Sequence, residues 1–179
     1  MATVFMELQE TFQTKFYVYI LILFFTSCRN NGIEHFIKGE IKTELLNGVL
    51  FLNSKPFKGI LLSYHENGTK KSEIRYKKGK KYGMEKKWYK DGKIKMERQY
   101  YNGMKINIHK GWWENEKLKY RYVFDNNGRY NGKVEEWYVN GQKLREFNYT
   151  KGLENGKQKL WDLDGKIKAN YEVINGERY

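Results

Sequence analysis

Short segments in which apolar and polar residues alternate recur along this chain, and glycine-containing turns separate them. Residues 83–90 and 93–100 show the pattern, with Asp91-Gly92 between them. Alternation with a period of two residues predicts β-strands. An Asn-Gly or Asp-Gly dipeptide between two such segments favours a tight hairpin, for which we expect a two-residue type I′ turn. Each such pair of segments is therefore predicted to form an antiparallel hairpin.

The hairpin pattern repeats five times, with a period of 24 or 25 residues. A large aromatic residue stands five positions after the start of each unit, and an Asn or Asp stands eight positions after it. A fixed period of this kind indicates a repeat array, in which each hairpin is stabilised by its neighbours. We therefore expect an all-β fold, an elongated antiparallel β-hairpin meander over residues 48–179. The units begin at Gly59, Gly83, Asn107, Gly132 and Gly156.

Some parts of the chain depart from this pattern. In the third unit Asn107 and Glu116 stand at two of the glycine positions, so we expect its first turn to be distorted. Residues 50–59 are predicted to form an incomplete leading hairpin. Residues 29–47 alternate more weakly and are predicted to be a tether with an irregular first strand.

The repeat columns resemble those of the MORN-repeat-variant family, which includes bacterial chains classed as YwqK-type antitoxins. The segment Gly83–Lys95, followed by Tyr100-Tyr101-Asn102-Gly103, is similar to the family's unit, and residues 55–59 are similar to its first unit. The resemblance covers about residues 48–179. It implies an elongated antiparallel sheet that is used for contacts with proteins or, in eukaryotic relatives, for proposed contacts with lipids.

The first thirty residues have the pattern of an export signal. An apolar run at 16–25 follows Lys15 and ends in Thr26-Ser27-Cys28. The run has the length of a secretory h-region and is shorter than the ~20 residues that span a bilayer. The small residues before Cys28 resemble the lipobox of bacterial lipoproteins, whose cysteine is lipidated when the signal is removed. We therefore expect residues 1–28 to be a lipoprotein-type signal peptide and Cys28 to anchor the protein to a membrane of the cell envelope. The alternatives are cleavage without lipidation and a buried segment with an incidental cysteine.

Positive charge is concentrated in the first half of the predicted array. The chain has 34 Lys and Arg against 21 Asp and Glu, a net charge of +13. Residues 58–110 contain sixteen basic and five acidic residues, whereas residues 111–179 contain thirteen and eleven. This asymmetry favours an acidic protein or an anionic membrane as partner, and export makes nucleic acid unexpected. A solvated surface that maintains solubility is the alternative. The candidate interaction surface consists of Lys70, Lys71, Lys77, Lys78, Lys80, Lys81, Lys86 and Lys87.

The repeated aromatic residue at position five forms a second candidate site. Equivalent positions of stacked hairpins share one face, so these rings are predicted to form one stripe. We expect the stripe to be the packing core of a thin sheet. The alternative is a partly exposed stripe that binds a partner segment or a glycan by stacking. Its members are Tyr64, Trp88, Trp112, Trp137 and Trp161.

No set of residues with the spacing of a catalytic, metal or cofactor site is evident. The histidines His35, His65 and His109 are far apart in the sequence, and the glycines are spaced as hairpin turns. We therefore expect a non-enzymatic binding or scaffold module without cofactor or metal. The alternatives are a toxin-neutralising antitoxin and a surface glycan or polymer binder. The oligomeric state is left open.

Overall fold

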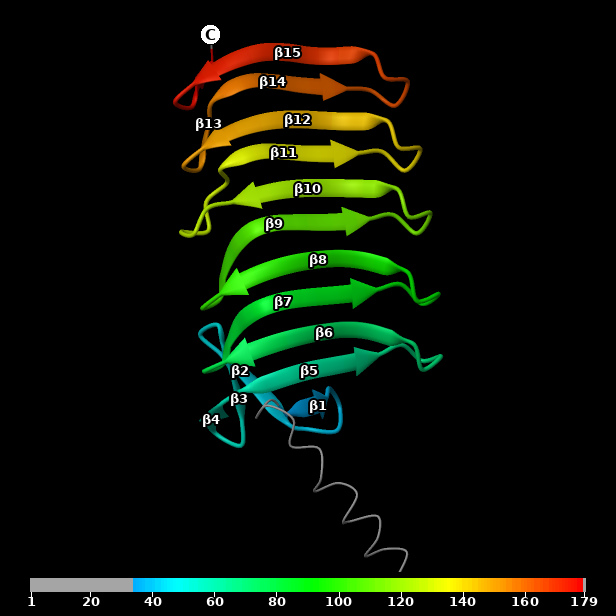
Figure 1. Ribbon diagram of the computed structural model, residues 1–179, viewed down its shortest axis with the longest axis vertical. Helices are drawn as coiled ribbons and strands as arrows, with labels where there is room; N and C mark the ends of the chain where they lie inside the picture. The colour runs from blue at the N-terminus through cyan, green and yellow to red at the C-terminus, as the bar shows by residue number, and fades with distance from the viewer. Residues whose placement is uncertain (1–33, 179) are drawn as a thin grey trace, which may run out of the picture. The chain divides into compact units, whose positions relative to one another are not determined.

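The computed structural model describes residues 34–178, so the predicted signal peptide and Cys28 lie outside the described residues. The described part consists of strands and turns, and no helix in it is long and apolar enough to span a membrane. Thirteen strands form one large sheet and three form a small one (Figure 1). The large sheet contains β1 (His35–Ile37), β5 (Gly59–Tyr64), β6 (Lys70–Lys77), β7 (Lys80–Trp88), β8 (Ile94–Tyr101), β9 (Met104–Trp112), β10 (Leu118–Phe124), β11 (Gly132–Trp137), β12 (Lys143–Thr150), β13 (Leu153–Glu154), β14 (Gly156–Trp161), β15 (Ile167–Ile174) and β16 (Glu177–Arg178). The small sheet contains β2 (Thr43–Leu46), β3 (Val49–Leu52) and β4 (Lys55–Pro56).

The predicted antiparallel hairpin meander is confirmed. From β5 to β16 each strand pairs antiparallel with the next one along the chain, except that the short β13 pairs only with β12, which also pairs with β14. In the second repeat, Gly83 on β7 lies opposite Tyr100 on β8, and Lys86 lies opposite Glu97. The strands expected at 83–90 and 93–100 are therefore β7 and β8. Each repeat contributes one hairpin to a continuous sheet.

The turns within the repeats are not the two-residue type I′ turns that we predicted. In the first repeat the Gly68 amide donates to the His65 carbonyl oxygen at 2.9 Å, and the His65 amide donates to the Thr69 carbonyl oxygen at 2.8 Å. Within this turn only Gly68 has a positive φ, 81°. These features define a three-residue turn, a type I turn followed by a left-handed glycine. The side chain of Asn67 favours this form because its Oδ1 accepts a hydrogen bond from the Thr69 amide at 3.3 Å.

Two-residue type I′ turns instead connect one repeat to the next. Lys78 and Gly79 have φ angles of 52° and 72°, and Asn102 and Gly103 have 50° and 84°. Both central residues of a type I′ turn require positive φ, which glycine adopts freely and asparagine tolerates. Figure 1 shows the within-repeat turns along one side of the large sheet and the between-repeat turns along the other.

The first turn of the third repeat is not distorted, contrary to our expectation. Glu116 adopts φ 64°, and its amide donates to the Trp113 carbonyl oxygen at 2.9 Å, as the glycine amide does in the other repeats. The extra residue of this repeat lies in the following between-repeat turn. There the Gly128 amide donates to the Asp125 carbonyl oxygen at 3.1 Å, and a three-residue turn replaces the two-residue one.

The N-terminal end of the array has its own small core. Strand β1 pairs in parallel with β5, and β3 and β4 form the leading hairpin expected near residues 50–59. Leu50, Phe57 and Leu61 are buried together. Of the range 29–47, expected to be a tether with an irregular first strand, the described residues contain β1 and β2.

The pairing register divides the side chains of the large sheet between two faces, because successive residues of a strand point to opposite sides. From β7 onward the sheet is a single layer, since these strands contact mainly their neighbours in the sheet. We call the face with position two of each repeat the core face and the face with position five the stripe face. Position two is Leu61, Glu85, His109, Val134 and Gln158, and position five is the predicted aromatic stripe.

Candidate functional site

Position two of each repeat forms the most buried column of the core face. Leu61 is 7% exposed, Glu85 and His109 are 1%, Val134 is 2% and Gln158 is 0%. Sequence reasoning missed this column because three of its five members are polar. The only signal was their constant spacing of two residues from each repeat start.

Glu85 is buried among cationic and phenolic groups. Its Oε2 lies 2.8 Å from Lys81 Nζ and its Oε1 lies 3.7 Å from Lys87 Nζ, and the side chain of Tyr100 also contributes to the pKa of this carboxyl. Burial alone would raise the pKa of Glu85, but the hydrogen bond and charge of Lys81 and the charge of Lys87 outweigh burial, so this pKa is lowered. Burial and the charge of Glu85 raise the pKa of Tyr100 to about 12. Glu85 is therefore a structural ion held at the centre of a network.

His109 occupies the same column one repeat later. Its ring centroid lies 5.6 Å from that of Tyr100 and 4.7 Å from that of Phe124. Its Nε2 donates to the Gln99 carbonyl oxygen at 2.9 Å. Burial, with the nearby charge of Arg98, lowers the pKa of His109 despite this hydrogen bond. His109 is therefore a neutral core residue.

Four of the eight candidate lysines are ion-paired with three carboxylates. Ion pairing reduces the attraction of these lysines for an anionic partner, because the partner also meets the carboxylate. Two of the pairs share Glu85. The pairs are Lys70–Glu73 at 2.8 Å, Lys81–Glu85 at 2.8 Å, Lys87–Glu85 at 3.7 Å and Lys86–Glu97 at 3.0 Å.

The other four, Lys71, Lys77, Lys78 and Lys80, form no ion pair with any residue in the described range. Three of them lie together on the first between-repeat turn, where Lys77 and Lys80 are cross-strand partners. Lys78 is at the tip of this turn and is exposed. The unpaired charge of the predicted surface is therefore concentrated at one turn.

Aromatic and apolar side chains of β7 and of the second between-repeat turn lie beside these lysines. Lys77 Nζ lies 5.1 Å from the ring centroid of Tyr82, and this ring lies 5.6 Å from that of Tyr101. Tyr101 is 55% exposed and Met104, its cross-strand partner, is 42% exposed. We call this surface the turn patch. It consists of Lys77, Lys78, Lys80, Tyr82, Tyr101 and Met104.

The predicted aromatic stripe lies on one face but is not the main buried layer. The four tryptophans are half-buried and Tyr64 is 43% exposed. The rings are on every second strand, and another residue lies between each pair. Ile94 is the cross-strand partner of Trp88, and Leu118 is that of Trp112. Lys143 is the partner of Trp137, and its Nζ lies 5.6 Å from the centroid of that ring. The stripe is therefore a surface of aromatic rings that alternate with apolar or lysine side chains.

In the first four repeats the residue after the stripe aromatic bonds to the next repeat, a role that sequence reasoning did not detect. The Tyr89 hydroxyl donates to the Trp112 carbonyl oxygen at 2.7 Å. Trp113 Nε1 donates to the Trp137 carbonyl oxygen at 3.1 Å. The asparagine of the within-repeat turn adds a second connection, since Asn115 Nδ2 donates to the Val139 carbonyl oxygen at 2.8 Å.

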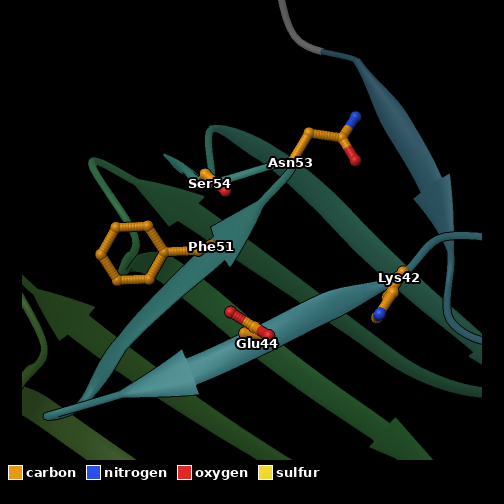
Figure 2. Close-up of a pocket in the computed structure, with 5 residues that line it drawn as sticks. All are labelled: Lys42, Glu44, Phe51, Asn53 and Ser54. Atoms are coloured by element: carbon orange, nitrogen blue, oxygen red, sulfur yellow. The ribbon is translucent and has the colours of Figure 1, made fainter.

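Other parts of the described chain offer no chemical site. His65 Nε2 bonds to the Trp88 carbonyl oxygen at 3.0 Å, and residues 34–178 contain no cluster of His, Cys, Asp or Glu that could hold a metal ion. A depression of about 150 Å³ lies on the small sheet, and Figure 2 shows Glu44 and Phe51 among the residues that line it. No protein-family model matches the sequence, and no curated protein is significantly similar to it.

Proposed function

We propose that this protein is a non-enzymatic scaffold of MORN-variant repeats, anchored by a lipid on Cys28, whose turn patch binds the anionic surface of a membrane. The observation that carries the proposal is the position of three unpaired lysines beside exposed Tyr101 and Met104. The lysines and the exposed Tyr101 and Met104 lie at neighbouring between-repeat turns, along the same edge of the large sheet (Figure 1). A flat anionic surface can therefore contact the charged and the apolar side chains together.

The composition of the turn patch suits a lipid headgroup layer. Each basic residue close to an anionic membrane surface contributes on the order of 1 kcal/mol. Tyrosine favours the boundary between headgroups and hydrocarbon, where its ring is in an apolar environment and its hydroxyl remains hydrated. Met104 adds exposed apolar area beside it. An acidic protein would use the lysines but would leave this apolar area without a role.

Flotation of vesicles tests this function with residues 34–179, which form one compact unit. The fragment should float with phosphatidylglycerol vesicles at low salt and not with phosphatidylcholine vesicles. High salt should release it, because ions screen exposed charges over about 8–10 Å at physiological ionic strength. Equal binding to both lipids, or no binding to either, would reject a role in anionic membrane contact.

A further inference from the structure

The aromatic stripe places one aromatic ring in every repeat. Trp88, Trp112 and Trp137 lie on β7, β9 and β11, which are two strands apart. Neighbouring strands are about 4.8 Å apart, so these rings recur roughly every 9–10 Å. Ile94 and Leu118 are the cross-strand partners of Trp88 and Trp112. Trp137 is paired with Lys143, whose Nζ lies 5.6 Å from its ring centroid and can donate hydrogen bonds beside the ring. Equivalent subsites at a fixed interval fit a partner that is itself a linear polymer.

A ladder of charged side chains runs beside the stripe on the same face. On β7, β9, β11 and β14 it lies two residues before the tryptophan. Its members pair across the sheet from β6 to β14. Acidic and basic residues are interspersed in it. The ladder consists of Glu73, Lys86, Glu97, Lys110, Arg121, Glu135, Glu146 and Lys159.

Because the ladder contains both acidic and basic side chains, it restricts the kind of polymer that can bind to this face. The ladder has four acidic and four basic members, and Glu97, Glu135 and Glu146 are ion-paired, so the ladder offers no net positive charge to a polyanion. An apolar helix would cover the ladder and remove water from charges that it could not replace with hydrogen bonds. Hydroxyl groups both donate and accept hydrogen bonds, so they can satisfy carboxylates and ammonium groups alike.

We infer that the stripe face binds an extended, uncharged β-1,4-linked polysaccharide. The flat C–H faces of its sugar rings stack on the tryptophans, and two sugar rings span the interval from one tryptophan to the next. Its hydroxyl groups bond to the ladder, for example to Lys86 and Glu97, which are 3.0 Å apart in an ion pair. The stripe therefore serves a second ligand, distinct from the lipid that the turn patch contacts.

Affinity electrophoresis of the full chain in a polyoxyethylene detergent tests this site. A gel containing hydroxyethylcellulose, an uncharged β-1,4-linked glucan, should retard the protein, whereas a gel containing dextran, an α-1,6-linked glucan, should not. In calorimetry, cellohexaose should bind at least about tenfold more tightly than cellobiose, because it reaches several tryptophans at once. Equal retardation in both gels, or no dependence on oligosaccharide length, would overturn the inference.

Two tryptophan variants locate the site. Trp112→Leu removes a ring from the stripe and should abolish the retardation. Trp113→Phe alters the neighbouring indole, whose Nε1 donates to the Trp137 carbonyl oxygen, and should leave retardation unchanged. A folded Trp112→Leu protein that is still retarded would exclude the stripe. If that variant does not fold, the length dependence of the unaltered protein decides alone.

Discussion

The hydroxyl of Tyr89 donates a hydrogen bond to the main-chain oxygen of Trp112, 23 residues further along the chain. The side chain of Tyr138 makes the equivalent bond to Trp161 at 3.1 Å. In each of these bonds the donor belongs to one repeat and the acceptor belongs to the next. The array is therefore connected by side chains as well as by strand pairing and by the contacts of neighbouring rings.

Tyr89→Phe removes one of these connections without changing the ring. A single hydrogen bond contributes about 1 kcal/mol, so the free energy of unfolding should fall by that amount in denaturant titration. Tyr64→Phe is the control, since Tyr64 is 43% exposed and its hydroxyl bonds to no residue in the described range. Losses of equal size in both variants would show that the connection between repeats does not stabilise the array.

His109→Gln should reduce the sensitivity of the fold to mild acid. The pKa of His109 is lowered below its ordinary value of 6.5, so the unfolded chain takes up a proton first as pH falls. Between the two pKa values the unfolded state binds more protons, and stability decreases as pH falls, by at most about 1.4 kcal/mol per pH unit. Gln158 holds the equivalent position with an uncharged amide, which makes glutamine a suitable replacement.

The measurement is the free energy of unfolding at a series of pH values. Above pH 6.5 the two proteins should have parallel profiles, and below it only the unaltered protein should show the additional loss. Profiles that stay parallel below pH 6.5 would mean that His109 does not titrate differently in the folded state.

Lys81 and Glu85 form a buried ion pair, and substitution of Lys81 should lower the stability of the protein more than substitution of Glu85. Lys81→Met leaves a buried carboxylate without its nearest cation and should destabilise the protein by about 3 kcal/mol, the low end for a buried pair. We place it at the low end because the Lys81 side chain is 32% exposed. Glu85→Leu introduces the residue that the first repeat has at this position and should be nearly neutral. Thermal unfolding of both variants checks this order, which the opposite ranking would contradict.

The sequence predicted the repeat, the strands and the hairpin meander because a period of two residues and a fixed glycine spacing are local signals. It did not predict which column is buried. Glu85 and Gln158 are polar, and the side chains that cover them belong to neighbouring strands and repeats. The within-repeat turn type was wrong for a similar reason, since the hydrogen bonds of the Asn67 side chain, one of them to the next repeat, select the three-residue turn. Lys86 is ion-paired and Lys78 is not, and this difference could not be predicted because the partner of Lys86 lies on a neighbouring strand.

Cys28→Ser tests the proposed anchor. If this thiol carries the lipid, the variant should lose acyl labelling and move from the membrane fraction to the soluble fraction. The unaltered protein, extracted and fractionated in parallel, is the reference. Unchanged labelling and fractionation of the variant would contradict lipid attachment at this residue.

Charge reversal at the turn patch, measured as affinity for phosphatidylglycerol vesicles, tests the membrane contact most directly. The test variant of residues 34–179 carries Lys77→Glu, Lys78→Glu and Lys80→Glu, and Glu116 shows that glutamate tolerates the left-handed conformation of Lys78. The control reverses three exposed lysines of the later repeats, of which Lys151 holds the turn position of Lys78 with φ 50°. Its substitutions are Lys151→Glu, Lys157→Glu and Lys168→Glu.

Both variants change the net charge equally, so only the location of the charge differs between them. Loss of three surface lysines at about 1 kcal/mol each should weaken vesicle binding roughly 100-fold or more in the turn-patch variant. The control should bind within a few-fold of the unaltered fragment. Equal weakening of the two variants, or no weakening of the turn-patch variant, would contradict binding of the membrane through the turn patch.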